Sequence, residues 1–142
     1  MRFFFIIFIL AVLAIMAACS TILKNAKLKE AEVTEAKASY TDISPQEAKK
    51  RLESDKTIIL LDVRTVEENL EKRIPNSVLI PVDVIDKEAE KRLPDKDAEI
   101  FVYCRSGRRS VIAAKSLVRM GYTRVYNLGG INDWPYETES GK

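Results

Sequence analysis

Histidine is absent from this sequence of 142 residues, and cysteine occurs only twice, at Cys19 and Cys104. Without imidazole, the chain cannot assemble a Ser-His-Asp triad or a Cys-His catalytic pair. Two cysteines so far apart in the sequence do not supply the ligands of an ordinary zinc site, so we expect neither a metal nor another cofactor. Any nucleophilic chemistry must therefore proceed without histidine as its base.

The chain also lacks an excess of charge of either sign. It has 23 Lys and Arg against 21 Asp and Glu, which gives a formal net charge of +2. Because nucleic-acid-binding domains usually carry a strong basic field, this near balance argues against a nucleic acid partner. Apolar residues make up 46% of the chain and charged residues 31%, which is typical of one globular domain with additional segments.

One long apolar run is present, and it lies at the N-terminus. The chain begins MR and continues FFFIIFILAVLAIMAACS, so the run ends in small residues at Cys19. A positive start, an apolar centre and a small-residue end are typical of a secretory signal. The stretch MAAC also resembles a bacterial lipobox, in which the cysteine receives lipid. We therefore expect residues 1–18 to be a lipoprotein-type signal peptide and Cys19 to be lipidated, which places the protein in the bacterial cell envelope, facing the periplasm or exterior.

An uncleaved anchor in the inner membrane is the alternative. The run from Phe3 to Leu23 is about long enough to span a bilayer, which takes on the order of 20 apolar residues. Either interpretation ties the protein to a membrane. Residues 19–39, rich in Ala, Lys and Glu, are predicted to be a solvated, partly helical tether. The folded domain is then expected at 40–137, with a short tail at 138–142.

Strand-like and helix-like patterns alternate through the rest of the chain. This alternation predicts an α/β fold with a mostly parallel sheet and helices on both faces. Ligands of such sheets bind beyond the carboxyl ends of the strands. Tyr103 and Trp134 are expected to be packing residues, and Gly129 and Gly130 to end the last strand in a turn. The predicted strands are 57–62, 77–82, 99–103 and 124–128. One predicted helix begins after Ser44, which is expected to be its N-cap, and two others cover 83–93 and 110–122.

The segment FVYCRSGRRS places Cys104 between a predicted strand and the start of a helix. Unpaired amides and the dipole at a helix start attract anions, and Gly107 lets the loop turn its amides inward. Arg105, Arg108 and Arg109 add full positive charges. Each of these effects favours the thiolate, so we expect a lowered pKa for Cys104 and no need for a general base.

The length of this loop separates two kinds of chemistry. A thiolate in an anion cradle suits phosphoryl transfer or sulfur transfer. Cysteine-dependent phosphatases resemble one another in placing an arginine six positions after the cysteine. Here that position is Ser110, and the arginine stands one residue earlier, at Arg109. The shorter loop fits a single sulfur atom better than a tetrahedral phosphate, so it favours sulfur transfer.

The residues from Cys104 to Arg109 resemble the active loop of rhodanese-like sulfurtransferases, which has the form C-R-x-G-x-R. Three further segments occur in the order that the family has them. The family usually has Gly-His before its Ile-Pro turn and Gly-Ala after it, whereas this chain has KR and NS. The similar segments are LLDVRTVEE at 60–68, RIPNSVLIP at 73–81 and LGGINDWP at 128–135.

This resemblance implies a rhodanese-like fold with a five-stranded sheet and an exchange of sulfur. Cys104 would take the outer sulfur of a small anionic donor such as thiosulfate, become a persulfide, and pass the sulfur to a cyanide, thiol or protein acceptor. By position, Asp62 and Arg64 would brace the loop or line the wall of the pocket. The donor and the bound sulfur would be held by Arg105, Ser106, Gly107, Arg108, Arg109 and Ser110.

Other interpretations stay open from the sequence. Cys104 could be an inert buried thiol, Arg108 could point to solvent, and Asp62 could only cap the segment from Thr65. The domain could also be a non-catalytic persulfide carrier or docking module, a cysteine-dependent phosphatase or arsenate reductase, or a redox sensor.

Overall fold

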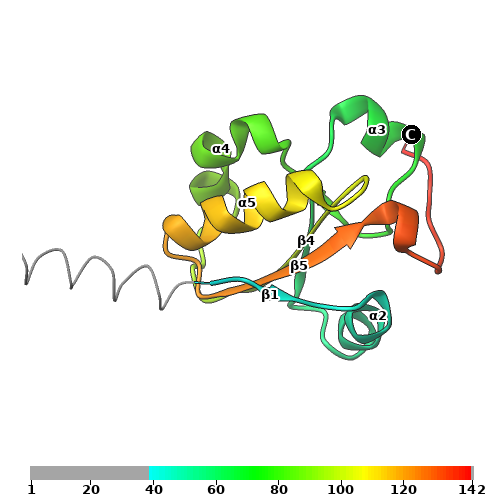
Figure 1. Cartoon of the computed structure of the whole chain (residues 1–142), viewed down its shortest axis with the longest axis horizontal. Coiled ribbons are helices and arrows are strands. Elements are labelled where there is room, and N and C mark those ends of the chain that lie inside the picture. Colours follow the sequence, from blue (N-terminus) through cyan, green and yellow to red (C-terminus); the bar gives the residue numbers. More distant parts are fainter. Residues whose placement is uncertain (1–38, 142) are drawn as a thin grey trace, which may run out of the picture. The chain divides into compact units, whose positions relative to one another are not determined.

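The computed structural model of the protein describes residues 39–141, which form a five-stranded sheet with helices on both faces (Figure 1). The α/β class predicted from the sequence is therefore confirmed. The strands are β1 (Thr41–Asp42), β2 (Ile59–Asp62), β3 (Val78–Leu79), β4 (Glu99–Cys104) and β5 (Arg124–Gly130). The α-helices are α2 (Pro45–Ser54), α3 (Val66–Glu71), α4 (Ile85–Arg92) and α5 (Arg108–Arg119), and the 3₁₀ helices are η1 (Val82–Val84) and η2 (Ile131–Asp133).

The strand order is β1-β5-β4-β2-β3, and every neighbouring pair is parallel. Parallel strands bring their carboxyl ends to one edge of the sheet, where ligands bind in open α/β folds. Because β2 and β4 pair directly, with Asp62 opposite Tyr103, the ends of these two strands are neighbours. The sheet thus brings Asp62 next to the segment that contains Cys104.

Three predictions fall on residues that the structure does not describe. They are the signal peptide at 1–18, lipidation of Cys19, and the tether, of which only residue 39 is described. Within residues 39–141, none of the helices combines the length and the apolar character needed to cross a bilayer. The membrane attachment stays a prediction from the sequence.

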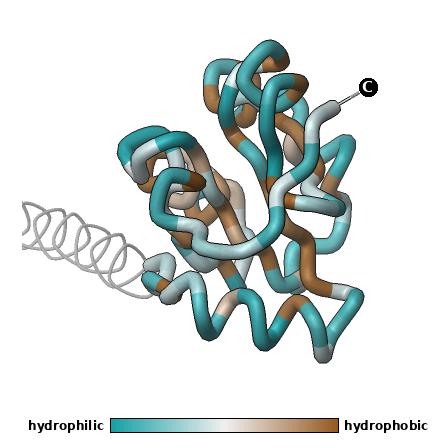
Figure 2. The backbone as a smooth tube through the Cα atoms, turned by 90° about the vertical axis from the view of Figure 1, so that its right-hand side faces the viewer, coloured by the Kyte–Doolittle hydropathy of each residue, from teal (hydrophilic) through white to brown (hydrophobic). Residues whose placement is uncertain are grey.

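The central strand β4 divides its side chains between the two faces of the sheet. Ile100, Val102 and Cys104 belong to the core beneath α4 and α5, whereas Phe101 and Tyr103 belong to the core on the α2 side. This alternation is the period of two expected of a strand that is buried on both faces. Figure 2 shows the hydrophobic segments concentrated between the helical layers. The Cys104 sulfur therefore lies on the face that α5 covers.

The end of β5 differs from the prediction. Gly129 and Gly130 were expected to end the strand, but β5 continues through both of them. A register shift between Val102 and Tyr103 lets Tyr103 pair with Gly129 and Cys104 pair with Gly130. The expectation of a turn was wrong because glycine also permits the close backbone approach that a strand beside a tight loop requires.

Other boundaries shifted by a few residues. The strand predicted at 77–82 is only two residues long, since Pro81 leads into η1. The helix predicted at 110–122 begins two residues earlier, at Arg108. The predicted cap of α2 is confirmed, because the Ser44 hydroxyl accepts a hydrogen bond from the Glu47 amide at 3.2 Å.

The C-terminal segment is attached to the domain. Arg73 and Glu139 form an antiparallel bridge in which each amide donates to the other's carbonyl at 2.8 Å. The Gly141 amide donates to the carbonyl of Leu70, also at 2.8 Å. The segment predicted as a tail at 138–142 is therefore held against the end of α3 through residue 141.

Candidate functional site

Cys104 is the last residue of β4, and its side chain is only 1% exposed. The chain then turns through the cysteine loop, residues 104–110, into α5. Gly107 makes the turn possible, because its φ of 95° lies in the left-handed region that side chains with a Cβ avoid. In this conformation the Gly107 amide donates a hydrogen bond to Cys104 Sγ at 3.1 Å. The loop therefore directs at least one N–H at the sulfur.

The environment of the sulfur favours its ionised form. Burial raises the pKa of Cys104, but hydrogen bonds from the backbone amides of Ser110, Ser106 and Gly107 lower it by more, so the net pKa lies below its usual value. The Ser110 hydroxyl adds to this lowering. The main lowering comes from amides and a hydroxyl, whereas the sequence had suggested a large share for the guanidinium groups.

Ser110 is fully buried at the first turn of α5. Its hydroxyl donates to the Gly107 carbonyl at 2.8 Å, which closes the loop on itself. A hydroxyl carries one hydrogen and can rotate it, so the same group can point to Cys104 Sγ when the sulfur is ionised. Ser110 thus links the shape of the cysteine loop to the charge of the sulfur.

The three arginines of the loop differ in their surroundings. Arg105 and Arg108 are exposed, in agreement with the interpretation that Arg108 points to solvent. Arg109 is only 26% exposed and makes a two-pronged ion pair with Glu68. Its two terminal nitrogens donate to the two carboxylate oxygens of Glu68 at 2.7 Å and 2.8 Å. From the sequence we expected Arg109 to hold the anionic donor and to favour the thiolate, but its two terminal nitrogens are already bound by a carboxylate.

Glu68 was not among the residues singled out from the sequence. It lies on α3, whose N-cap is Thr65 and not Asp62 as one alternative held. The Thr65 hydroxyl accepts from the Glu68 amide at 3.3 Å, and the Glu68 carboxylate accepts from the Thr65 amide at 3.1 Å. The pattern T-x-x-E is the signature of this capping box, so the sequence did contain the signal for the helix. It contained none for the contact with Arg109.

Hydrogen bonds from Arg109 lower the pKa of Glu68 to about 2. The same pair raises the pKa of Arg109, and the Cys104 thiolate contributes to this rise. Both groups are therefore charged across the pH range in which a protein works. The pair lies beside the Cys104 sulfur and has a formal net charge of zero.

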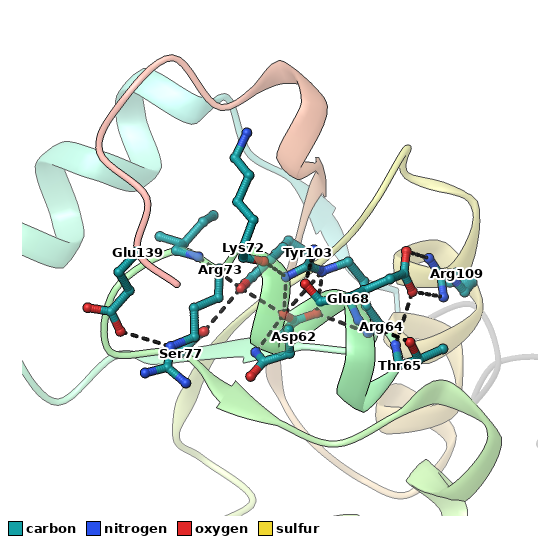
Figure 3. A network of polar contacts seen from close by, with 12 residues as sticks. Asp62, Arg64, Thr65, Glu68, Lys72, Arg73, Ser77, Tyr103, Arg109 and Glu139 are labelled. Carbon is teal, nitrogen blue, oxygen red and sulfur yellow. Dashed lines mark hydrogen bonds and ion pairs between the residues drawn. The ribbon is translucent and has the colours of Figure 1, made fainter. Parts of the chain in front are cut away.

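Asp62 is the centre of a buried polar network (Figure 3). Its carboxylate accepts from Arg64 Nε at 2.9 Å and from Arg64 Nη2 at 2.6 Å. It also accepts from Asn69 Nδ2 and from the Tyr103 hydroxyl, each at 3.0 Å. Asp62 is 0% exposed and Arg64 4% exposed, so neither presents a surface that could line a pocket wall. Of the two roles expected from the sequence, bracing fits the geometry.

The bracing acts on α3. Arg64 Nη2 donates to the Lys72 carbonyl at 2.7 Å, and Arg64 Nη1 donates to the Glu68 carbonyl at 3.3 Å. Lys72 is the C-cap of α3, and its amide also donates to the Glu68 carbonyl, so the Arg64 bonds reinforce the C-terminal end of a short helix. Arg64 therefore holds the backbone of the residue whose side chain binds Arg109, and the network reaches the cysteine loop through Glu68.

Tyr103 does more than pack in the sheet. Its hydroxyl donates to Asp62, lies 3.0 Å from Ser77 Oγ, and accepts from the Ile74 amide at 3.2 Å. Burial raises the pKa of Tyr103 to about 12, and the Asp62 charge adds to the rise. Tyr103 thereby joins the end of β2 to the turn at 74–77. No local sequence pattern indicates this bond, because it depends on strand register.

The departures from the family pattern have physical explanations in this chain. Asn76 stands where the family has Gly, and it adopts a left-handed φ of 62°, which Asn tolerates better than most residues. Ser77 stands where the family has Ala, and its hydroxyl contacts Tyr103. Arg73 stands where the family has His, and its Nε donates to the Glu139 carboxylate at 2.8 Å. These positions alter a turn and leave the cysteine loop in place.

No group of three His, Cys, Asp or Glu side chains within residues 39–141 is arranged to hold a metal ion. The chemistry available from the described residues is that of a thiolate in an amide cradle. Such a cradle stabilises one negatively charged atom, either the sulfur of Cys104 or a second sulfur bonded to it.

Residues 44–137 match the family model of the rhodanese-like domain, and this span contains the cysteine loop, α3 and the buried network around Asp62. The Bacillus subtilis protein YrkF, whose name proposes a sulfur carrier role, is 37% identical over 107 residues. That match covers 75% of this chain and 57% of YrkF, so the chain spans little more than half of that relative.

One curated relative and one solved structure that match this chain come from Escherichia coli. The thiosulfate sulfurtransferase PspE is 36% identical over 73 residues, which cover 51% of this chain and 70% of PspE. A rhodanese whose structure was solved with anions superposes with a TM-score of 0.56 at 32% identity. That superposition covers 59% of this chain and 99% of the other.

Proposed function

The chain belongs to the family of rhodanese-like domains, and from this premise we propose that it is a sulfurtransferase that works through a persulfide on Cys104. The Cys104 thiolate attacks the outer sulfur of a donor, and the bond between the two donor sulfurs breaks. With thiosulfate, sulfite leaves with the electron pair and Cys104 becomes a persulfide. A nucleophilic acceptor, cyanide or a thiol, then takes the outer sulfur and regenerates the thiolate.

The observation that supports this proposal best is the hydrogen bond from the Gly107 amide to Cys104 Sγ at 3.1 Å. Inert buried thiols lie in apolar surroundings, whereas a backbone N–H directed at sulfur stabilises a thiolate. The burial of Cys104 alone would favour an inert thiol, but the amide and hydroxyl groups around it outweigh burial in setting its pKa. Arg109 stands five positions after Cys104, a loop length that suits one sulfur atom.

The proposed roles of the other residues follow from their places. Amides of the cysteine loop, with the Ser110 hydroxyl, would hold the outer sulfur of the persulfide. The exposed Arg105 would attract the anionic donor. A guanidinium has five N–H donors, so Arg109 would contact the donor through those that do not bind Glu68. Asp62 and Arg64 would act at a distance, by positioning α3.

The test is the intact mass of the full chain after incubation with thiosulfate. We expect a gain of one sulfur atom that cyanide removes as thiocyanate. The variant Cys104→Ser should show neither the gain nor thiocyanate. Hydrolysis of an aryl phosphate that depends on Cys104, in the absence of sulfur loading, would replace the proposal with a phosphatase.

A persulfide carrier is the second candidate, and the similarity to YrkF favours it. A carrier would load sulfur at Cys104 and keep it until a protein acceptor arrives. The two candidates differ in the rate of unloading by small acceptors. Loading followed by slow release to cyanide, with the persulfide stable over many minutes, would favour the carrier.

We also propose that the domain is attached to the bacterial cell envelope through its N-terminal segment. The basis is the sequence alone: the apolar run of residues 3–18 that ends in the lipobox-like MAAC. Lipidation at Cys19 would be shown by incorporation of labelled palmitate that the variant Cys19→Ser abolishes. Membrane attachment without incorporation of label would instead indicate an uncleaved anchor in the inner membrane.

A further inference from the structure

We propose that Glu68 determines donor specificity, by cancelling the charge of Arg109 so that singly charged sulfur donors react in preference to doubly charged thiosulfate. The inference rests on the proposed sulfur transfer at Cys104 and names the class of donor that the same site takes. Glu68 would be a specificity-determining and positioning residue, since it acts on the donor through Arg109.

The geometry of the pair supports this role. Both carboxylate oxygens of Glu68 bind the two terminal nitrogens of Arg109 at 2.7 Å and 2.8 Å, the end-on arrangement in which an arginine and a carboxylate match best. The two side chains are 26% and 24% exposed, so solvent and salt screen them less than a surface pair. A donor that reaches Arg109 therefore meets a neutral pair where the sequence suggests a cation.

Glu68 is held in place from several directions. Its carboxylate also accepts from the Thr65 amide at 3.1 Å, which fixes the side chain at the start of α3. Its carbonyl accepts from Arg64, whose guanidinium is itself fixed by the buried Asp62. The carboxylate oxygen that accepts from Thr65 also accepts from Arg109 Nη1, so the capping box and the ion pair hold the carboxylate in the same place. The neutralised state is thus built into the fold.

The other groups around the sulfur do little to balance the negative charge of the donor. The groups that contribute most to the ionised state of Cys104 are neutral amides and a hydroxyl, and Arg109, which also interacts with the sulfur, is already paired with Glu68. Arg105 and Arg108 are exposed, so water and salt weaken their fields. A dianion must approach a thiolate, which is itself negative, beside an arginine whose charge is already balanced. Each additional negative charge on the donor therefore raises the barrier to attack.

Two donors isolate this effect because their sulfur chemistry is the same and their charge differs. Thiosulfate carries two negative charges, and Cys104 thiolate takes its outer sulfur while the S–S bond breaks and sulfite leaves with the electron pair. Methanethiosulfonate, as its sodium salt, carries one negative charge. The same bond breaks, and methanesulfinate leaves with the electron pair. Both reactions give the same Cys104 persulfide, and neither needs an oxidant or a reductant.

The experiment compares kcat/KM of the full chain for the two donors, with cyanide as acceptor, in wild type and in Glu68→Gln. Glutamine keeps an oxygen that can accept from the Thr65 amide, so the capping box survives while the charge is removed. Glu67→Gln is the matched control, because it removes the same charge from the exposed neighbouring residue of α3. Glu68→Asp keeps the charge on a shorter side chain.

We expect Glu68→Gln to raise the ratio of kcat/KM for thiosulfate to that for methanethiosulfonate about tenfold, from removal of one charge several ångströms from the donor. Glu67→Gln and Glu68→Asp should leave the ratio within about twofold of wild type. If Glu68 had only a structural role, Glu68→Gln would lower kcat/KM for both donors by the same factor and leave the ratio unchanged.

The outcomes separate this inference from the proposed function. If both donors load Cys104 and the ratio does not change in Glu68→Gln, the inference is wrong and the proposed function stands. If Glu68→Gln does not fold, Glu68→Asp takes its place. A ratio of the two kcat/KM values that differs from wild type by more than about twofold in Glu68→Asp then overturns the inference, and an unchanged ratio supports it. If neither donor loads the wild-type chain, the proposed function fails and the inference fails with it.

Discussion

Gly130 lies so close to Arg105 that a Cβ added at Gly130 would stand 2.6 Å from the Arg105 carbonyl oxygen. The same Cβ would stand 2.8 Å from Cα of Ser106, and both neighbours are backbone atoms that no side-chain rotation can move. Gly130 is the last residue of β5 and pairs with Cys104 in the sheet, so its backbone packs directly against the cysteine loop. A residue that the sequence suggested was part of a turn therefore sets the position of the loop.

We expect Gly130→Ala to displace the cysteine loop and to slow sulfur loading of Cys104 at least about tenfold. Overpacking against backbone typically costs about 1–3 kcal/mol of unfolding free energy. The measurements are loading by intact mass and stability by urea unfolding. Gly121→Ala is the control, because Gly121 has a left-handed φ of 91° and open space around it, at the far end of α5.

The control should lose about 1 kcal/mol of unfolding free energy from the strained φ and load sulfur as fast as wild type. Normal loading in Gly130→Ala would mean that the loop adapts to the methyl group. In that case the close approach of β5 would have no bearing on the reaction.

The contrast between Gly130 and Cys104 shows how far sequence patterns reach. The cysteine loop, the parallel sheet and the helix after the loop could all be predicted, because strand period, glycine and helix starts are local signals. The position of Gly130 could not, since it depends on a register shift between β4 and β5. Glu68 was missed for the same reason, because its partner Arg109 lies 41 residues away. Local patterns identify the candidate cysteine, and tertiary contacts determine the charge around it.

Tyr103→Phe should destabilise the protein without slowing sulfur loading. Removal of the hydroxyl deprives Asp62 of one hydrogen bond and leaves the buried Ile74 amide without its acceptor. Leaving such groups unpaired costs about 1–3 kcal/mol. The Gly107 bond to Cys104 Sγ is not involved, so the folded fraction should load normally. Urea unfolding and intact mass check the two parts.

Tyr136→Phe is the matched control for this substitution. The ring of Tyr136 packs edge-on against Trp134, and no hydrogen bond of its hydroxyl occurs among the described residues. We expect its stability to stay within about 0.5 kcal/mol of wild type. Slower loading in Tyr103→Phe, at full folding, would show that the buried network acts on the sulfur as well as on the fold.

The pH dependence of alkylation at Cys104 should show a lowered pKa. Because the folded pKa lies below the ordinary value, the rate of alkylation should fall at a lower pH than that of a free cysteine. Ser110→Ala removes one hydrogen bond to the thiolate, so its inflection should move to higher pH with the same plateau. Iodoacetamide reaction at Cys104, followed by peptide mass so that Cys19 does not interfere, gives both profiles.

The urea-unfolded chain supplies the reference inflection for a free cysteine, at about 8.5. An inflection at or above that value in the folded protein would show that burial outweighs the amides. Cys104 would then be an inert thiol, and the proposed sulfur transfer would lose its main support.

Because of the ion pair between Glu68 and Arg109, part of the free energy of unfolding should depend on pH. The pKa of Glu68 is lowered from 4.5 to about 2 in the folded protein. A carboxylate with a depressed folded pKa binds fewer protons than in the unfolded chain, so its contribution is complete above about pH 5 and is lost as pH falls towards about 2. We expect this contribution to be about 1–3 kcal/mol, after allowance for partial exposure.

Urea unfolding of wild type and Glu68→Gln at several pH values measures it. The difference in unfolding free energy should be largest near neutral pH and shrink as pH falls from about 5 to about 2. Glu53→Gln gives the comparison, because Glu53 is 62% exposed and pairs only with Lys49 one turn away, where an ion pair contributes little. A difference for Glu68→Gln that stays constant over this range would show that the charge of Glu68 does not stabilise the fold. The carboxylate would then leave Arg109 easily, and the neutral pair beside Cys104 would be one of several states that a donor meets.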